Sequence, residues 1–112
     1  MMTPNKAIEI VDRIKINSYT EEDKLRWINE LEGEVQRLVI QEDEIKQYSY
    51  PEDMDQELLI PATFDNLYEL YLSAKIDYHN KEYDVYNNSA MMFDAQYSEY
   101  KKDYIRKNPA RG

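Results

Sequence analysis

The sequence contains no cysteine, one histidine, two glycines and four prolines. Without cysteine the chain has no disulfide framework, no thiol nucleophile and no cysteine-ligated metal. The single histidine, His79, does not make a histidine-rich metal site. Because glycine and proline are scarce and β-branched residues do not cluster, the composition favours helices over strands.

Long apolar runs are also missing. No run approaches the roughly 18 residues of a membrane span, and the opening residues MMTPNKAIEIVDRIK lack the apolar block of a secretion signal. We therefore expect a protein of the cytosol, or of a particle assembled there, with no membrane contact. Neither a glycine-rich phosphate loop nor a nucleophile motif is present, so we expect no enzyme, no cofactor and no metal.

Acidic side chains outnumber basic ones by 23 to 14, which gives the 112 residues a net charge of -9. Such a charge opposes generic binding to DNA phosphates. The charge is uneven, since residues 101–112 hold five basic side chains and only one acidic one. The length favours one helical domain, residues 1–112, with one modest core.

The spacing of apolar residues predicts helices in the first half of the chain. Residues 1–18 form a helix and linker in this prediction, with Thr3 as the N-cap and Pro4 at the first helical position. Thr20 caps a clear amphipathic helix over residues 20–40, and Asp23 resembles the second member of a capping box. Residues 41–62 lack regular spacing, and we expect a loop or an arm there.

The second half carries a stricter pattern. From Tyr83 to Tyr104, aromatic residues and one alanine alternate at spacings of three and four, the register of helices packed at about 20°. Residues 63–106 are compatible with one long helix or with two helices that meet near Asn80. Residues 107–112 are predicted to be a frayed basic tail. The predicted fold is all-α, a small bundle of about four helices with a long irregular segment near residues 41–62.

Two sets of residues follow from these patterns. The predicted core consists of residues on the helical stripes: Leu25, Ile28, Leu31, Val35, Leu38, Leu72, Ile76, Tyr83, Tyr86, Ala90, Phe93 and Tyr97. The predicted contact surface for other proteins combines the irregular segment with the basic end: Tyr48, Tyr50, Met54, Leu58, Lys101, Lys102 and Arg106. Because buried tyrosine hydroxyls need partners, the tyrosine stripe suits a half-wet groove better than a dry core.

Several sequence blocks resemble a family of small phage and prophage proteins grouped with the head–tail connector (head-completion adaptor) proteins. The blocks stand here as Glu22-Asp23-Lys24, Arg26-Trp27, Glu57 to Pro61, Leu67-Tyr68, Ile76-Asp77-Tyr78 and Tyr86-Asn87-Asn88-Ser89. They cover most of residues 19–100. Three positions depart from the family pattern: Lys81 replaces a usual glycine, Thr63 a common second proline, and Asp103 an expected aromatic.

The resemblance implies a structural virion protein rather than a catalyst. Connector subunits are helical and assemble on the portal as a ring of about twelve copies, in a closed symmetric arrangement. The ring extends the DNA channel in the virion neck and presents a docking surface for the tail. The implied partners are the portal and tail-side proteins, with DNA only as passing cargo, and assembly takes place in the cytoplasm of the bacterial host.

Two other functions fit the same composition. A small acidic helical protein can mimic the charge of DNA and block a DNA-binding enzyme, which predicts carboxylates in rows and salt-sensitive binding to a basic partner. The stripe of tyrosines is also compatible with a homodimeric helical scaffold.

Overall fold

The computed structural model describes residues 1–109, which form four α-helices and no strand. The helices are α1 (Pro4–Ile14), α2 (Glu21–Glu34), α3 (Asn66–His79) and α4 (Tyr83–Lys107). A π-helical turn, η1 (Val35–Ile40), continues α2, and a short 3₁₀ turn, η2 (Ala62–Phe64), precedes α3. The predicted all-α bundle with a long irregular segment is confirmed. Residues 110–112 of the predicted basic tail lie outside the described residues.

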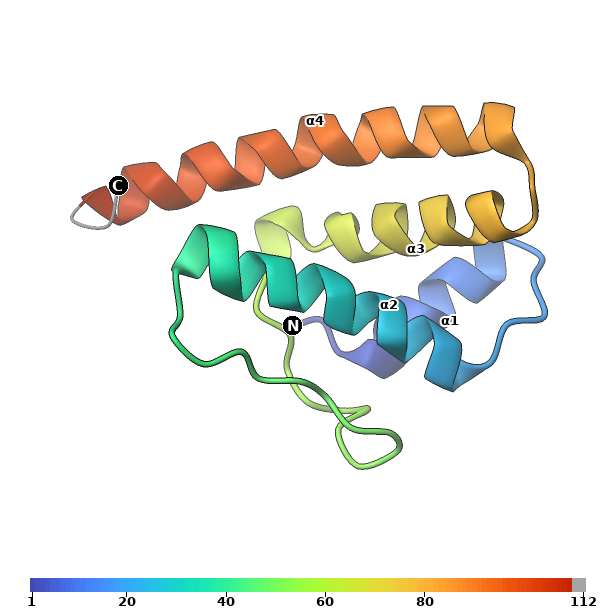
Figure 1. The fold of residues 1–112 in the computed structure, drawn as a ribbon, viewed down its shortest axis with the longest axis horizontal. Helices are drawn as coiled ribbons and strands as arrows, with labels where there is room; N and C mark the ends of the chain where they lie inside the picture. Colours follow the sequence, from blue (N-terminus) through green and yellow to red (C-terminus); the bar gives the residue numbers. More distant parts are fainter. Residues whose placement is uncertain (110–112) are drawn as a thin grey trace.

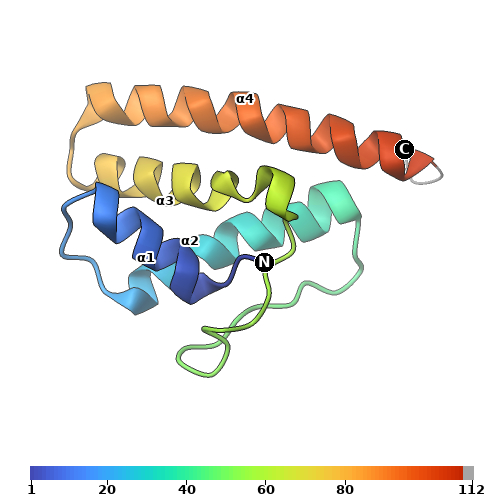
Figure 2. The ribbon, with the colours of Figure 1, turned by 180° about the vertical axis from the view of Figure 1, so that it is seen from behind.

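The helices form three layers (Figure 1). α4 lies along α3, and α3 separates it from α1 and α2, as the view from behind also shows (Figure 2). α3 and α4 are antiparallel neighbours joined by residues 80–82, so residues 63–106 form two helices rather than one. At this turn Lys81 has a left-handed backbone with φ of 62°. A residue other than glycine pays about 1 kcal/mol for that conformation.

Local capping explains where the first two helices begin. The Thr3 hydroxyl accepts a hydrogen bond from the backbone N–H of Lys6 at 3.2 Å. At α2, the Thr20 hydroxyl accepts from the Asp23 N–H at 3.1 Å, and the Asp23 carboxylate accepts from the Thr20 N–H at 3.2 Å. The predicted caps and the capping box are therefore confirmed.

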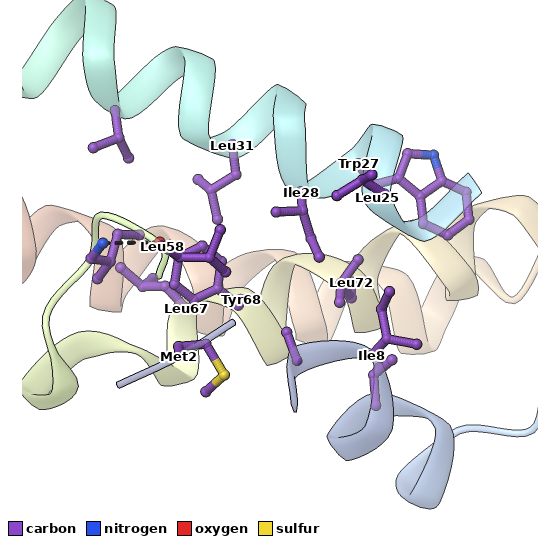
Figure 3. Packing of buried hydrophobic residues seen from close by; sticks show 14 of the residues in the cluster. Met2, Ile8, Leu25, Trp27, Ile28, Leu31, Leu58, Leu67, Tyr68 and Leu72 are labelled. Atoms are coloured by element: carbon purple, nitrogen blue, oxygen red, sulfur yellow. Dashed lines mark hydrogen bonds between the residues drawn. The ribbon is translucent and has the colours of Figure 1, made fainter. Parts of the chain in front are cut away.

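The apolar core lies between α1, α2 and α3, where side chains from all three helices meet (Figure 3). The core prediction is confirmed for the buried residues Leu25, Ile28, Leu31, Val35, Leu72, Ile76, Phe93 and Tyr97. It is wrong for Leu38, which is 56% exposed, and for Tyr83, which is 53% exposed. Tyr86 and Ala90 are only half-buried.

Each of these errors has a structural reason. The wider winding of the π-helical turn changes the direction in which residues after Glu34 point, so Leu38 leaves the stripe that α-helical spacing predicts. Tyr83 opens α4 directly after the turn, where its ring contacts only the edge of the exposed Tyr78 ring. Tyr86 and Ala90 stay half-buried because α4 packs chiefly against one helix, α3.

Side-chain amides of α2 and of the π-helical turn η1 hold the irregular segment in place. Asn29 pairs with both backbone groups of Tyr48, donating to its carbonyl at 3.0 Å and accepting from its N–H at 2.8 Å. Gln36 pairs in the same way with Lys46, with both distances 2.8 Å. Two amide side chains thus satisfy backbone groups that a neighbouring strand would otherwise satisfy. The segment is a docked strap along α2 and not a free arm.

Glu32 lies between these two amides on α2 and is fully buried. Its carboxylate accepts hydrogen bonds from the hydroxyls of Tyr68 at 2.5 Å and Tyr48 at 2.8 Å, and from the backbone N–H of Leu59 at 3.0 Å. The Tyr68 hydroxyl in turn accepts from the N–H of Ile60 at 2.9 Å. Burial raises the pKa of Glu32, although the three hydrogen bonds act in the opposite direction.

The Glu32 network predicts a large effect of truncation. Glu32→Ala leaves two tyrosine hydroxyls and one backbone N–H without their acceptor, so we expect a loss of about 2–4 kcal/mol in the free energy of unfolding. Urea denaturation measures it. The control is Glu44→Ala, which removes an exposed carboxylate of the same charge and should change stability by less than about 0.5 kcal/mol. Equal effects of the two substitutions would contradict the role of Glu32.

The raised pKa of Glu32 also predicts a pH dependence. Folding raises this pKa above its ordinary value of 4.5, so the contribution of Glu32 to stability is complete below that value and is lost as pH rises through the folded pKa. Glu32→Gln does not titrate, and it shares all other acidic groups with the wild type. The stability of the wild type relative to this variant should therefore fall as pH rises from about 4. A difference that stays constant up to about pH 8 would contradict the prediction.

Candidate interaction surfaces

The structure assigns most of the predicted contact residues of the irregular segment to the core. Tyr48, Met54 and Leu58 are all at least 93% buried, so their prediction as an external contact surface is wrong. The reason is that backbone hydrogen bonds tie the segment to the start of the chain, from Asn5 to Met54 and from Leu58 to Met2. Tyr50 remains exposed, and its hydroxyl contacts Glu21 at 3.3 Å.

The predicted basic residues do lie on the surface, in the last turns of α4. Lys101, Lys102 and Arg106 are all exposed. Beside them are two exposed apolar side chains, Ile105 at 55% and Leu38 at 56%, which line one shallow hollow of about 120 Å³ together with Lys101. We call these five residues the basic end.

A larger groove lies at the other half of α4. It has a volume of about 630 Å³ and is open to solvent between α3, α4 and the end of α2. We call it the aromatic groove. Its walls are Tyr71, Tyr78, Tyr86 and Phe93, with Ala74 and Ala90 between them and Glu34, Lys75 and Asp94 as its charged residues.

Two pairs of aromatic rings in the groove join the antiparallel helices α3 and α4. Tyr78 of α3 contacts Tyr86 of α4 with ring centroids 5.4 Å apart, and Tyr71 contacts Phe93 at 5.3 Å. On each helix the two aromatic residues are seven positions apart, which is two helical turns. The groove is therefore a direct product of heptad spacing on two adjacent helices.

The aromatic groove carries uncompensated negative charge. The ammonium of Lys75 is held by Glu30 at 2.8 Å and lies 5.5 Å from the centroid of the Tyr71 ring. Glu34 and Asp94 have no ion-pair partner among residues 1–109. A cation from a partner would therefore find two carboxylates without a cation partner beside aromatic faces, one of which, Glu34, interacts with the Tyr97 hydroxyl.

Buried polar contacts fix the end of the groove that lies next to the α3–α4 turn. Asp77 of α3 is fully buried and accepts from Lys15 at 2.9 Å and from Ser89 of α4 at 3.0 Å. His79 stacks on Trp27 with centroids 5.2 Å apart and ring planes 9° apart. These contacts give His79 a packing role and hold the turn of the α3–α4 pair against α1 and α2.

Further apolar side chains are exposed at other positions of the first half of α4. They are Tyr83, Val85, Met91 and Met92. Only Phe93, Tyr97 and Tyr100 are buried among the 25 residues of α4.

Sequence reasoning identified part of this surface. Tyr86 and Phe93 were predicted as core residues of a tyrosine stripe that suits a half-wet groove, but the opposite wall from α3 and the two carboxylates were missed. The spacing of seven between Tyr71 and Tyr78 is a signal that a comparison of both helices would have found.

Within the described part of the chain, no group of three or more His, Asp or Glu side chains is placed to hold a metal ion. None of the described helices is both long and apolar enough to cross a membrane. Comparisons of the chain with protein-family models, curated proteins and solved structures found no match.

Two adjacent residues of α4 test whether its exposed side contributes to the stability of the fold. Met92 is 59% exposed and Phe93 is 9% exposed. We expect Phe93→Ala to cost about 3 kcal/mol, since it leaves a cavity against α3, whereas Met92→Ser should cost less than about 0.5 kcal/mol. Thermal and urea unfolding measure both values. A large loss from Met92→Ser would show that α4 packs differently.

Proposed function

We propose that this chain is a head–tail connector, a structural virion protein of a phage or prophage. In this function it assembles on the portal as a ring of about twelve copies. The ring extends the DNA channel of the virion neck and presents a docking surface for the tail.

The observation that supports the proposal is that the sequence blocks resembling the connector family contact one another in the fold. Two of these blocks meet at the α3–α4 turn, where Ser89 donates to Asp77 at 3.0 Å and Tyr78 contacts Tyr86. Trp27, from a third block, stacks on His79, the residue that follows Asp77 and Tyr78. Blocks that are distant in sequence thus form one framework around the same turn.

The remaining blocks have structural roles as well. Leu59, in the block from Glu57 to Pro61, and Tyr68, in the next block, both donate to the buried Glu32. Lys24 is buried and donates to Asp12 of α1 at 2.7 Å. A shared pattern that serves the framework of the subunit supports a structural function over a catalytic one.

The charge of the chain is compatible with a channel wall. A net charge of -9 repels the phosphate backbone of DNA, so a ring of such subunits binds passing DNA weakly. Weak binding is what a channel through which DNA slides requires.

The test is direct binding to a portal. The purified chain is mixed with the portal ring of the phage or prophage that encodes it, and bound copies are counted by native mass spectrometry and electron microscopy. We expect about twelve chains per portal. An unrelated small acidic protein serves as the control for binding by charge alone.

The opposite result is equally clear. Portal rings that stay bare at about 100 µM chain would contradict the connector function, since they set the dissociation constant above that concentration. Tight, salt-sensitive binding to a DNA-binding enzyme would instead support a DNA mimic.

A further inference from the structure

We propose that the basic end of one copy binds in the aromatic groove of a second copy. The inference deepens the proposed function and rests on it, because a connector ring needs a defined contact between neighbouring subunits. It names the two surfaces that make this contact and the charges that select it.

Charge is the first argument for this pairing. From residue 101 to residue 107, α4 carries four basic side chains and one acidic one. Lys102 pairs with Glu99, and Arg106 and Lys107 share Asp103, so this stretch keeps a net positive charge, and Lys101 has no ion pair in the part of the chain that the structure describes.

The aromatic groove carries the carboxylates of Glu34 and Asp94, neither of which has a cation partner among the described residues, although Glu34 interacts with the Tyr97 hydroxyl. The cation that lines the groove, Lys75, is already paired with Glu30. Opposite charges on the two surfaces favour their encounter and fix its orientation.

Chemical fit is the second argument. The basic end combines cations with the exposed apolar side chains of Ile105 and Leu38. The groove offers aromatic walls, which accept both apolar groups and cations on their faces. The chain already uses such contacts internally, since the ammonium of Lys101 lies 4.7 Å from the centroid of the Tyr97 ring.

Position is the third argument. Ala90 of the groove and Ile105 of the basic end are fifteen residues apart on one helix, which is about 20 Å at the rise of an α-helix. A rigid helix cannot fold back on itself, so one copy cannot fill its own groove with its own basic end. The contact is therefore between unlike surfaces of different copies, the type that builds rings when its rotation closes.

The experiment uses two charge reversals at exposed positions, each with a matched control. Asp94→Arg changes the groove, and its control Asp43→Arg changes an exposed acidic residue of the irregular segment. Arg106→Glu changes the basic end, and its control is Arg13→Glu. Both arginines lie in the last turn of a helix and pair with an acidic residue of the same helix. Circular dichroism verifies that all four variants keep the helical content of the wild type.

Native mass spectrometry and sedimentation velocity then follow association over a concentration series. We expect the wild type and both controls to form species larger than a dimer, and these to weaken at high salt. Asp94→Arg and Arg106→Glu, each alone, should associate at least about tenfold more weakly.

Mixing the two variants gives the decisive result. Asp94→Arg keeps an intact basic end, and Arg106→Glu keeps an intact groove, so an equal mixture can form one correct contact. We expect a heterodimer that grows no further, because the two surfaces left over are both defective. A symmetric contact of groove with groove predicts no such rescue.

Several outcomes would overturn this inference without touching the proposed function. They are association of Arg106→Glu as strong as that of the wild type, a mixture that forms no heterodimer, or a wild type that stays monomeric at about 1 mM. The binding of the wild type to a portal ring is measured separately. Portal binding together with any of these outcomes would retain the connector and reject this contact.

Discussion

A carboxylate buried without a cation is the constraint on which this fold depends. Removing Glu32 from water is costly unless its oxygens find donors, and they find them on two tyrosines and one backbone N–H. These donors come from α3 and from two parts of the irregular segment. Because Glu32 must satisfy all of them at once, it fixes α2, α3 and the segment relative to one another. Burial and the adjacent carboxylate raise the pKa of Tyr48 and Tyr68, which keeps both hydroxyls protonated as donors.

α3 transmits this constraint to the surface of the molecule. One side of α3 packs into the core through Leu67, Leu72 and Ile76, and the other side supports α4. A helix that is apolar on two sides belongs in the middle of a layered structure. Tyr68 fixes the inner side of α3 through its hydrogen bond to Glu32, and Asp77 fixes the outer side through its hydrogen bond from Ser89. The wall of the aromatic groove that α3 provides is therefore rigid.

Features that depend on neighbouring residues in the sequence were predictable. The caps at Thr3 and Thr20 and the stripe of α2 up to Val35 follow from local chemistry and periodicity. The same patterns were compatible with one or two helices over residues 63–106, and the turn after Asn80 became clear only in the structure. Leu38 was not predictable in this way, because spacing assumes α-helical winding and the chain changes to a π-helical turn. The docking of the irregular segment left no periodic signal either, because Asn29 and Gln36 pair with backbone groups that every residue has. The groove was half predictable, since its α4 wall follows from the stripe of tyrosines and its charge comes from three helices.

Because α4 packs chiefly against α3, with a further ring contact from Tyr100 to Phe64 of η2, we expect this helix to open as a cooperative unit of its own. Its detachment removes Phe93, Tyr97 and Tyr100 from their packing and breaks the hydrogen bond from Ser89 to Asp77. The core between α1, α2 and α3 keeps its contacts, so this opening costs less than global unfolding. Any molecule that binds only the closed form makes the opening rarer, by a free energy of RT ln(1 + c/Kd) for free ligand at concentration c. In the proposed contact between copies, association and the order of α4 are thermodynamically linked, and the outer layer of the protein is most rigid when it is occupied.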